Sequence, residues 1–220
     1  MLKRLGERTG GWNKMSSRRT PVRGRRLAIA AAVAALVAGT SGLPAAPAAA
    51  AEATSLVSWG TLSQAEVPAG LGSPLSIAGG DGFALVVRAN GSVAAWGSSW
   101  ASADVLTPPV LTDATQVAAG SNHGLALRSN GTVVAWGSNL AGQLDVPAGL
   151  SGVVAVAAGC RHSVALRSNG EVVTWGATDP NFGPDHGILD VPAGLSDVTA
   201  ISAGCFHTLA LTSSGTVVAW

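Results

Sequence analysis

Residues 120–136 read GSNHGLALRSNGTVVAW, and the same pattern recurs three more times along the chain. The related strings are GDGFALVVRANGSVAAW at 80–96, GCRHSVALRSNGEVVTW at 159–175 and GCFHTLALTSSGTVVAW at 204–220. Each string runs without a gap from a glycine to a tryptophan; the glycines are Gly80, Gly120, Gly159 and Gly204. This constant register indicates a structural repeat of about forty residues.

Two further anchors extend the repeat on both sides of these strings. Tryptophans recur at intervals of 37, 40, 39 and 45 residues, at Trp59, Trp96, Trp136, Trp175 and Trp220. A proline lies twelve residues before each repeat glycine, at Pro68, Pro108, Pro147 and Pro192, and three of these prolines belong to a VPAGL string. Coincidence does not produce so many anchors in one register.

Short segments rich in β-branched residues fill each unit, for example VVAVAAG at 153–159 and EVVTWG at 171–176. Asn-Gly pairs at 90–91, 130–131 and 169–170 are strong two-residue hairpin signals, and Ser214-Gly215 takes that place in the last unit. No stretch has the 3.6-residue period of an amphipathic helix. The sequence predicts an all-β protein: three clear strands per unit, with VPAGL as a weaker fourth, form the four-stranded antiparallel blades of a β-propeller.

A family resemblance rests on WGSNLAGQLDVPAGL at 136–150 and AAGCRHSVALRSNGEVVTWG at 157–176. These strings resemble repeats of the regulator of chromosome condensation family, and the resemblance covers about residues 55–220. The units at Trp59 and Trp96 lack the N-x-x-G-Q-L string. The resemblance implies a seven-bladed propeller. The secreted bacterial branch, which includes a proteinaceous β-lactamase inhibitor, looks closest.

The sequence ends at Trp220 without the glycine that follows the other repeat tryptophans. We therefore expect residues 51–220 to hold about four blades, incomplete at the C-terminus, as a fragment of the seven-bladed ring. A closed four-bladed propeller is the alternative.

The N-terminal residues 1–50 have the features of an export signal. Nine of the thirteen basic residues lie at or before Arg26, an uncharged run follows from Leu27 to Ala38, and Ala48-Ala49-Ala50 offers a cleavage site. The uncharged run is shorter than the about 20 residues of a membrane span. We expect general secretory export, cleavage near Ala50 and no membrane span in the mature chain; translation starts at Met1 or at Met15.

The charge of the remaining chain excludes one class of partner. From Ala51 onward four arginines face eleven acidic residues, which gives a net charge of −7. This balance argues against nucleic acid, whose phosphates require a basic surface.

Three histidines, His123, His162 and His207, share one register, and Phe83 takes that place in the first unit. A three-histidine metal site is excluded because neighbouring sheets lie about 10 Å apart, whereas a zinc ion holds each ligand at about 2 Å. We expect each ring to bond backbone groups near a blade junction. The repeat tryptophans are interpreted as packing between blades. Trp100 lies outside the register and is either an exposed binding anchor or a lid over a blade edge.

Cys160 and Cys205 also share a register, directly after the repeat glycine. Blades packed face to face hold equivalent positions too far apart for a disulfide, which favours free, buried thiols. A disulfide is the alternative if these positions lie near a crowded central axis.

A longer connection, ATDPNFGPDHGILD at 177–190, marks one unit as a candidate binding loop. Its candidate binding residues, in addition to Trp100, are Asp179, Asn181, Phe182, Asp185 and His186. Asp179, Asn181 and Asp185 are oxygen ligands of the type that calcium prefers, but they do not complete the calcium-loop pattern. We expect a solvated, turn-rich loop without metal.

No catalytic motif appears in the sequence, and no pair of acids repeats as a general acid and base. We therefore expect a secreted, non-enzymatic module without cofactor that binds a protein or a cell-surface polymer. The alternatives are the propeller part of a secreted glycan-active enzyme and a β-lactamase inhibitor. Guanine-nucleotide exchange, the activity of the family's eukaryotic namesake, is a further alternative, and export away from cytosolic GTPases argues against it.

Overall fold

A computed structural model describes residues 67–97, 103–177 and 187–220. The chain divides into two units, Met1–Ala48 and Ala49–Trp220, and the described residues belong to the second. The predicted leader over 1–50 lies outside the described residues, as does Trp59.

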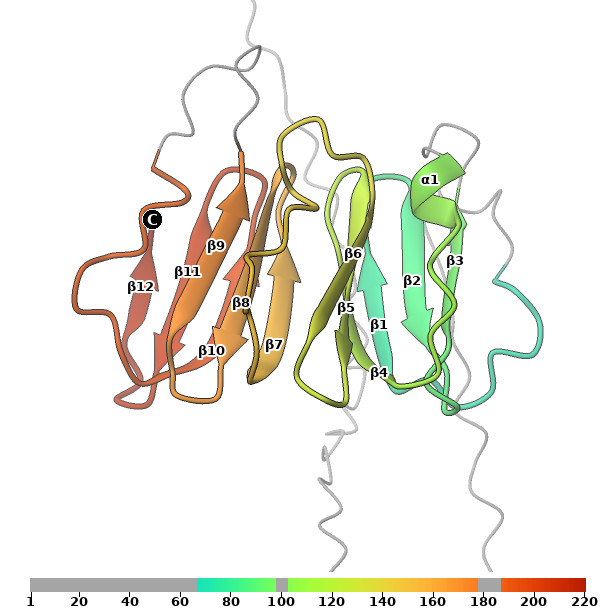
Figure 1. The fold of residues 1–220 in the computed structure, drawn as a ribbon, viewed down its shortest axis with the longest axis horizontal. Coiled ribbons are helices and arrows are strands. Elements are labelled where there is room, and N and C mark those ends of the chain that lie inside the picture. Colours follow the sequence, from blue (N-terminus) through green and yellow to red (C-terminus); the bar gives the residue numbers. More distant parts are fainter. Residues whose placement is uncertain (1–66, 98–102, 178–186) are drawn as a thin grey trace, which may run out of the picture. The chain divides into compact units, whose positions relative to one another are not determined.

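Within the described residues, twelve strands form four antiparallel sheets that follow one another in chain order (Figure 1). Sheet 1 contains β1 (Ser76–Gly79), β2 (Phe83–Val87) and β3 (Val93–Gly97), and sheet 2 contains β4 (Ala114–Ala119), β5 (His123–Arg128) and β6 (Val133–Gly137). Sheet 3 contains β7 (Val153–Ala158), β8 (His162–Arg167) and β9 (Val172–Gly176), and sheet 4 contains β10 (Val198–Ala203), β11 (Thr208–Thr212) and β12 (Val217–Ala219). One short helix, α1 (Ala103–Leu106), lies between sheets 1 and 2 in the sequence. The all-β, antiparallel prediction is confirmed.

The Asn-Gly pairs form the hairpins between the second and third strands. In sheet 2, Gly131 has a φ of 76°, in the left-handed region that glycine tolerates. The Asn130 side-chain oxygen accepts hydrogen bonds from the backbone N–H of Thr132 (3.0 Å) and from its hydroxyl (2.7 Å). The local sequence therefore closes these hairpins, and the Gly131 carbonyl at the tip also accepts a hydrogen bond from the N–H of Val153 in the next sheet (3.1 Å).

The VPAGL segments form turns in place of the weak fourth strand that we expected. The N–H of Leu150 donates to the carbonyl of Pro147 (3.1 Å), Leu195 repeats this bond to Pro192 (3.1 Å), and Gly149 has a φ of 77°. Proline has no N–H to donate to a sheet ladder, and a residue at positive φ interrupts an extended strand. The described sheets consequently have three strands each.

Three hydrophobic clusters fill the spaces between successive sheets. Between sheets 1 and 2, Leu85 and Val87 of β2 pack with Val117 of β4 and Trp136 of β6. The same arrangement places Trp175 between sheets 2 and 3, and Trp220 against the cluster between sheets 3 and 4. Trp136, Trp175 and Trp220 thus each pack toward the preceding sheet.

Polar side chains on the first strands also join successive sheets. The Ser76 hydroxyl accepts a hydrogen bond from the N–H of Val117 (3.2 Å). At the equivalent position in sheet 2, the Gln116 amide accepts from the N–H of Val156 (3.0 Å) and donates to its carbonyl (3.4 Å). The equivalent residue of sheet 3 is Ala155, whose methyl group forms no such bond.

Candidate binding face

The turns between the first and second strands of all four sheets meet at one end of the sheets. These turns cover residues 80–82, 120–122, 159–161 and 204–206, and together they line a hollow of about 190 Å³. The loop at 138–143 lies at the same end, where the N–H of Ser138 donates to the carbonyl of Asn122 (2.8 Å). We call these four turns and this loop the turn face.

The repeat glycines allow the four turns to approach one another. A Cβ at Gly80 would lie 2.6 Å from the carbonyl oxygen of Gly120 and would overlap the ring of Phe83. A Cβ at Gly120 or Gly159 would overlap its own unit's histidine ring and the carbonyl oxygen of the next repeat glycine. Each glycine is therefore required by the space available.

The buried histidines bond across the sheets, to side-chain hydroxyl groups of the next unit. Nε2 of His123 lies 3.1 Å from Oγ of Ser163, and Nε2 of His162 lies 3.0 Å from Oγ1 of Thr208. These partners differ from the backbone groups that we expected. His207 is exposed. In the first unit, Phe83 needs no partner, and the position equivalent to Ser163 in the next unit is Gly124, which has no hydroxyl.

The direction of the first of these hydrogen bonds follows from a third residue. The Ser163 hydroxyl donates to the carbonyl of Gln143 (2.9 Å), so it accepts from His123, whose Nε2 carries the proton. Nδ1 of His123 and of His162 is buried without a hydrogen-bond partner. Burial, followed by repulsion from His162, lowers the pKa of His123 to about 4. Burial, followed by repulsion from His207, lowers the pKa of His162 to about 4.

A histidine beside a serine also suggests a base beside a nucleophile, but this pair has no such use. Both side chains are fully buried, and the serine proton points away from the histidine toward a carbonyl. A nucleophile must reach a substrate and give its proton to the base. The pair therefore joins sheets 2 and 3.

The tryptophan indoles attach the connections between sheets to the following sheet. Nε1 of Trp136 donates to the carbonyl of Val105 (3.0 Å), Nε1 of Trp175 to that of Gln143 (3.0 Å), and Nε1 of Trp220 to that of Ile188 (3.2 Å). Trp96 is half-buried. The tryptophans thus combine hydrophobic packing with one directed hydrogen bond.

Replacing either buried indole by phenylalanine measures how much its hydrogen bond and its packing contribute to the free energy of unfolding. We expect Trp175→Phe and Trp136→Phe each to lower the free energy of unfolding by about 2 kcal/mol, from a lost hydrogen bond and a partly filled space. The two sites lie between different pairs of sheets, so the double variant should show nearly additive losses in urea unfolding. A loss at one site and none at the other would contradict their equivalence.

The N-x-x-G-Q-L string folds into a braced loop between sheets 2 and 3. The Asn139 side chain accepts from the N–H of Leu144 (2.8 Å) and donates to Asp145 (2.9 Å). The buried Gln143 side chain accepts from the N–H of Ala141 (2.8 Å), while the backbone carbonyl of Gln143 accepts from Ser163 and Trp175. This bracing holds Leu140 with 82% of its surface exposed.

A groove of about 380 Å³ crosses the turn face and draws residues from all four sheets. Two of its lining residues are large exposed hydrophobic side chains, Leu140 and Phe206, the latter 65% exposed. Asp81, Arg161 and the two cysteines also line it. The groove therefore combines apolar contact area with both signs of charge.

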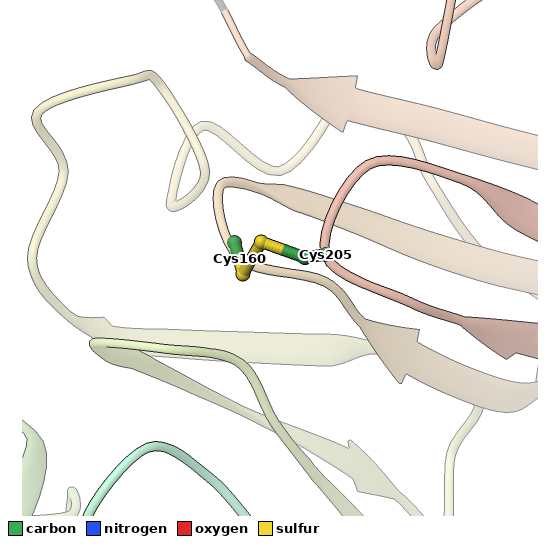
Figure 2. Close-up of a disulfide and its surroundings, with 2 residues drawn as sticks. All are labelled: Cys160 and Cys205. Atoms are coloured by element: carbon green, nitrogen blue, oxygen red, sulfur yellow. A yellow bond between two sulfur atoms is a disulfide. The ribbon is translucent and has the colours of Figure 1, made fainter. Parts of the chain in front are cut away.

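The two cysteines form a disulfide between the turns of sheets 3 and 4 (Figure 2). Their Cα atoms lie 4.4 Å apart, and the N–H of Cys160 donates to the carbonyl of Cys205 (3.4 Å). The expectation of free, buried thiols was wrong. Sheet-to-sheet spacing does not apply at the turns, because the adjacent glycines let the backbones converge there.

Several predicted site residues are not part of this description. Trp100, Asp179, Asn181, Phe182, Asp185 and His186 lie outside the described residues. Over 67–97, 103–177 and 187–220, no three His, Cys, Asp or Glu side chains gather as metal ligands. In the same ranges no helix has the length and apolarity of a membrane span.

Sequence reasoning did not single out Leu140, Phe206, Asp81 or Arg161. A signal for the last three exists within the repeat itself. The two residues after the repeat glycine read Asp-Gly, Ser-Asn, Cys-Arg and Cys-Phe in the four units, whereas the flanking positions hardly vary. Side chains that vary on a constant scaffold indicate a surface available for recognition.

Comparison with known proteins supports this architecture. Residues 114–143, 153–183 and 198–220 match the Regulator of chromosome condensation (RCC1) repeat. These matches coincide with sheets 2, 3 and 4, so the RCC1 repeat corresponds to one three-stranded sheet with the connection that follows it.

Solved structures resemble the chain at low identity. The ectodomain of the Physcomitrella patens receptor kinase CR4 has 22% identity and a TM-score of 0.50 over 66% of this chain and 40% of that one. Yeast RCC1 (Prp20), solved bound to Kap60, has 23% identity and a TM-score of 0.50 over 63% of this chain and 40% of that one. Human WBSCR16 has 20% identity and a TM-score of 0.50 over 67% of this chain and 48% of that one.

The chain spans less than half the length of each of these structures. The likeness establishes a propeller-like RCC1-repeat fold. No curated protein sequence matches the chain significantly.

Proposed function

We propose that the chain is a secreted, non-enzymatic propeller protein that binds another protein through the turn face. The observation that carries this proposal is the pair Leu140 and Phe206, exposed by 82% and 65% on one groove. A single exposed apolar side chain is common on a protein surface, but two large ones gathered on one groove indicate an interaction site, and such side chains anchor protein interfaces.

The scaffold supports this use because it holds both anchors in place before binding. Leu140 lies in the loop braced by Asn139 and Gln143, and Phe206 directly follows a cysteine of the disulfide. A pre-organised surface loses less conformational entropy when it binds. RCC1-repeat folds are protein-interaction modules in general, and yeast RCC1 has been solved bound to Kap60. We further propose that the sheets are blades of the seven-bladed ring that the family resemblance implies, and that residues 1–50 direct export.

Site-specific cross-linking tests the proposed face. We expect a photo-reactive amino acid at position 206 or 140 to capture a discrete protein from the envelope or medium of the producing cells. The same amino acid at Val110, which is 98% exposed in the connection before β4, is the matched control and should capture none.

The captured protein then serves as the ligand for affinity measurements. Leu140→Ser combined with Phe206→Ser should raise its Kd by at least about tenfold, while Val110→Ser should leave it unchanged. Equal capture at all three positions would contradict the proposal. Capture of carbohydrate would support a cell-surface polymer in place of a protein.

A further inference from the structure

The Cys160–Cys205 disulfide occupies the one described junction of first strands that lacks a side-chain bridge. Ser76 bonds the N–H of Val117 between sheets 1 and 2, and Gln116 bonds Val156 between sheets 2 and 3. The equivalent positions between sheets 3 and 4 are Ala155 and Ile201, and alanine offers no polar group. In this part of the chain the disulfide takes over the task of the missing bridge.

The disulfide also lies directly beside side chains of the groove. Arg161 follows Cys160, Phe206 follows Cys205, and all four residues line the groove. The turn that carries Phe206 is held by the disulfide, by the bond from Cys160 N–H to the Cys205 carbonyl, and by the bond from Gly204 N–H to the His207 carbonyl (2.9 Å). Opening the disulfide therefore removes the covalent link that fixes Phe206 relative to sheet 3.

A reductant can approach this bond from the turn face. Both cysteines are half-buried, and both line the groove of about 380 Å³ and the hollow of about 190 Å³. Disulfides in the interior of a domain are shielded from thiols, whereas exposed ones exchange readily.

We propose that the Cys160–Cys205 disulfide is a redox switch of the turn face, whose reduction frees the Phe206 turn and weakens binding there. The binding part of this proposal rests on the function proposed above. The reductant is a protein or small-molecule dithiol. One of its thiolates attacks a cysteine sulfur, forms a mixed disulfide and releases the other cysteine, which takes up a proton. Its second thiolate then displaces the remaining cysteine, so the chain gains two electrons and two protons and the dithiol becomes a disulfide.

Binding and reduction are linked in both directions. If reduction weakens a ligand by some factor, the bound ligand opposes reduction by the same factor, because the two equilibria share one cycle. A partner seated in the groove also covers the path by which the reductant approaches. The switch therefore responds to free copies of the chain before bound ones.

Fluorine NMR tests the structural half without any ligand. The sequence contains three phenylalanines, Phe83, Phe182 and Phe206, so labelling with 4-fluorophenylalanine gives three signals, assigned by single substitutions to leucine. We expect dithiothreitol to shift or broaden the Phe206 signal and to leave that of Phe83, buried in sheet 1, unchanged. Cys160→Ala combined with Cys205→Ala should show the altered Phe206 signal without reductant and no further response to it.

A peptide probe tests the binding half. The probe is the tightest binder selected from a random-peptide display library against the oxidised chain, provided that it does not bind the variant that combines Leu140→Ser with Phe206→Ser. We expect the affinity of this peptide for the chain to fall at least about tenfold on reduction. The double-alanine variant should match the reduced chain. An unchanged Phe206 signal, unchanged affinity, or reduction only after unfolding in urea would each overturn the switch. If the cross-linking experiment finds no partner while reduction still alters both readouts, the proposed function fails and the switch stands.

Discussion

Gly80→Ala is expected to lower the free energy of unfolding by about 3 kcal/mol. The new methyl group would meet the ring of Phe83 and the backbone oxygen of Gly120, 2.6 Å away. The ring is fully buried and the oxygen belongs to the next turn, so relief requires sheets 1 and 2 to move apart. Urea unfolding followed by tryptophan fluorescence measures the loss.

The preceding residue provides the control. Gly79 ends β1 and has nothing within 4 Å of the position of a Cβ, and its φ is not positive. Gly79→Ala should therefore change the free energy of unfolding by less than about 0.5 kcal/mol. Similar losses for these two neighbouring substitutions would show that backbone entropy, and not the approach of the turns, determines the glycine register.

Acidification from pH 7 to pH 5 should destabilise the chain by about 2 kcal/mol for each buried histidine, about 4 kcal/mol in all. The pKa of His123 and of His162 is lowered to about 4 in the folded chain, against an ordinary value of 6.5. Between these values the unfolded chain binds more protons than the folded chain. The free energy of unfolding therefore rises with pH across this window and falls on acidification.

Urea midpoints at several pH values between 5 and 7 measure this slope, in a range above the ordinary pKa values of Asp and Glu. His162→Gln should remove about half of the slope, whatever it does to stability at pH 7. His207→Gln, at an exposed position, removes the second and smaller cause of the lowered His162 pKa and should therefore reduce the slope only slightly. A wild-type stability independent of pH over this range would show that both rings bind protons in the folded chain.

Local features of the fold follow directly from the sequence. The hairpins at Asn130-Gly131 and its equivalents close through bonds between residues two to four positions apart, so each depends on its own few residues. The repeat register also predicts which residues face a neighbouring sheet, as Trp136 and Trp175 illustrate. The prediction of a fourth strand at VPAGL was wrong because the valine of this segment favours a strand, whereas its proline and glycine favour the turn that forms.

Contacts between units were harder to predict because they depend on how the sheets are inclined to each other. The partner of His123 is Ser163, forty residues away, and no local pattern distinguishes it from the backbone groups that we expected. The prediction of free thiols at Cys160 and Cys205 failed for a related reason. An average distance between sheets was applied to turns that converge, and the convergence follows from the crowded glycines and not from the cysteines.

The histidine–hydroxyl contacts have a consequence for how such a chain can grow by duplication. The second and third units each present a histidine ring toward the next unit, and the third and fourth units carry the hydroxyl group that meets it one residue after that position. A copy of the third unit inserted after itself would be compatible, because His162 would meet the serine of the copy in place of Thr208. A copy of the first unit inserted after the second would place Ala84 opposite His123 and leave a buried nitrogen without a partner. Phe83 has no polar atom to pair, and the indole of Trp136 fills the space at Gly124. The order of units along the chain is therefore constrained by the side chains that meet at each junction.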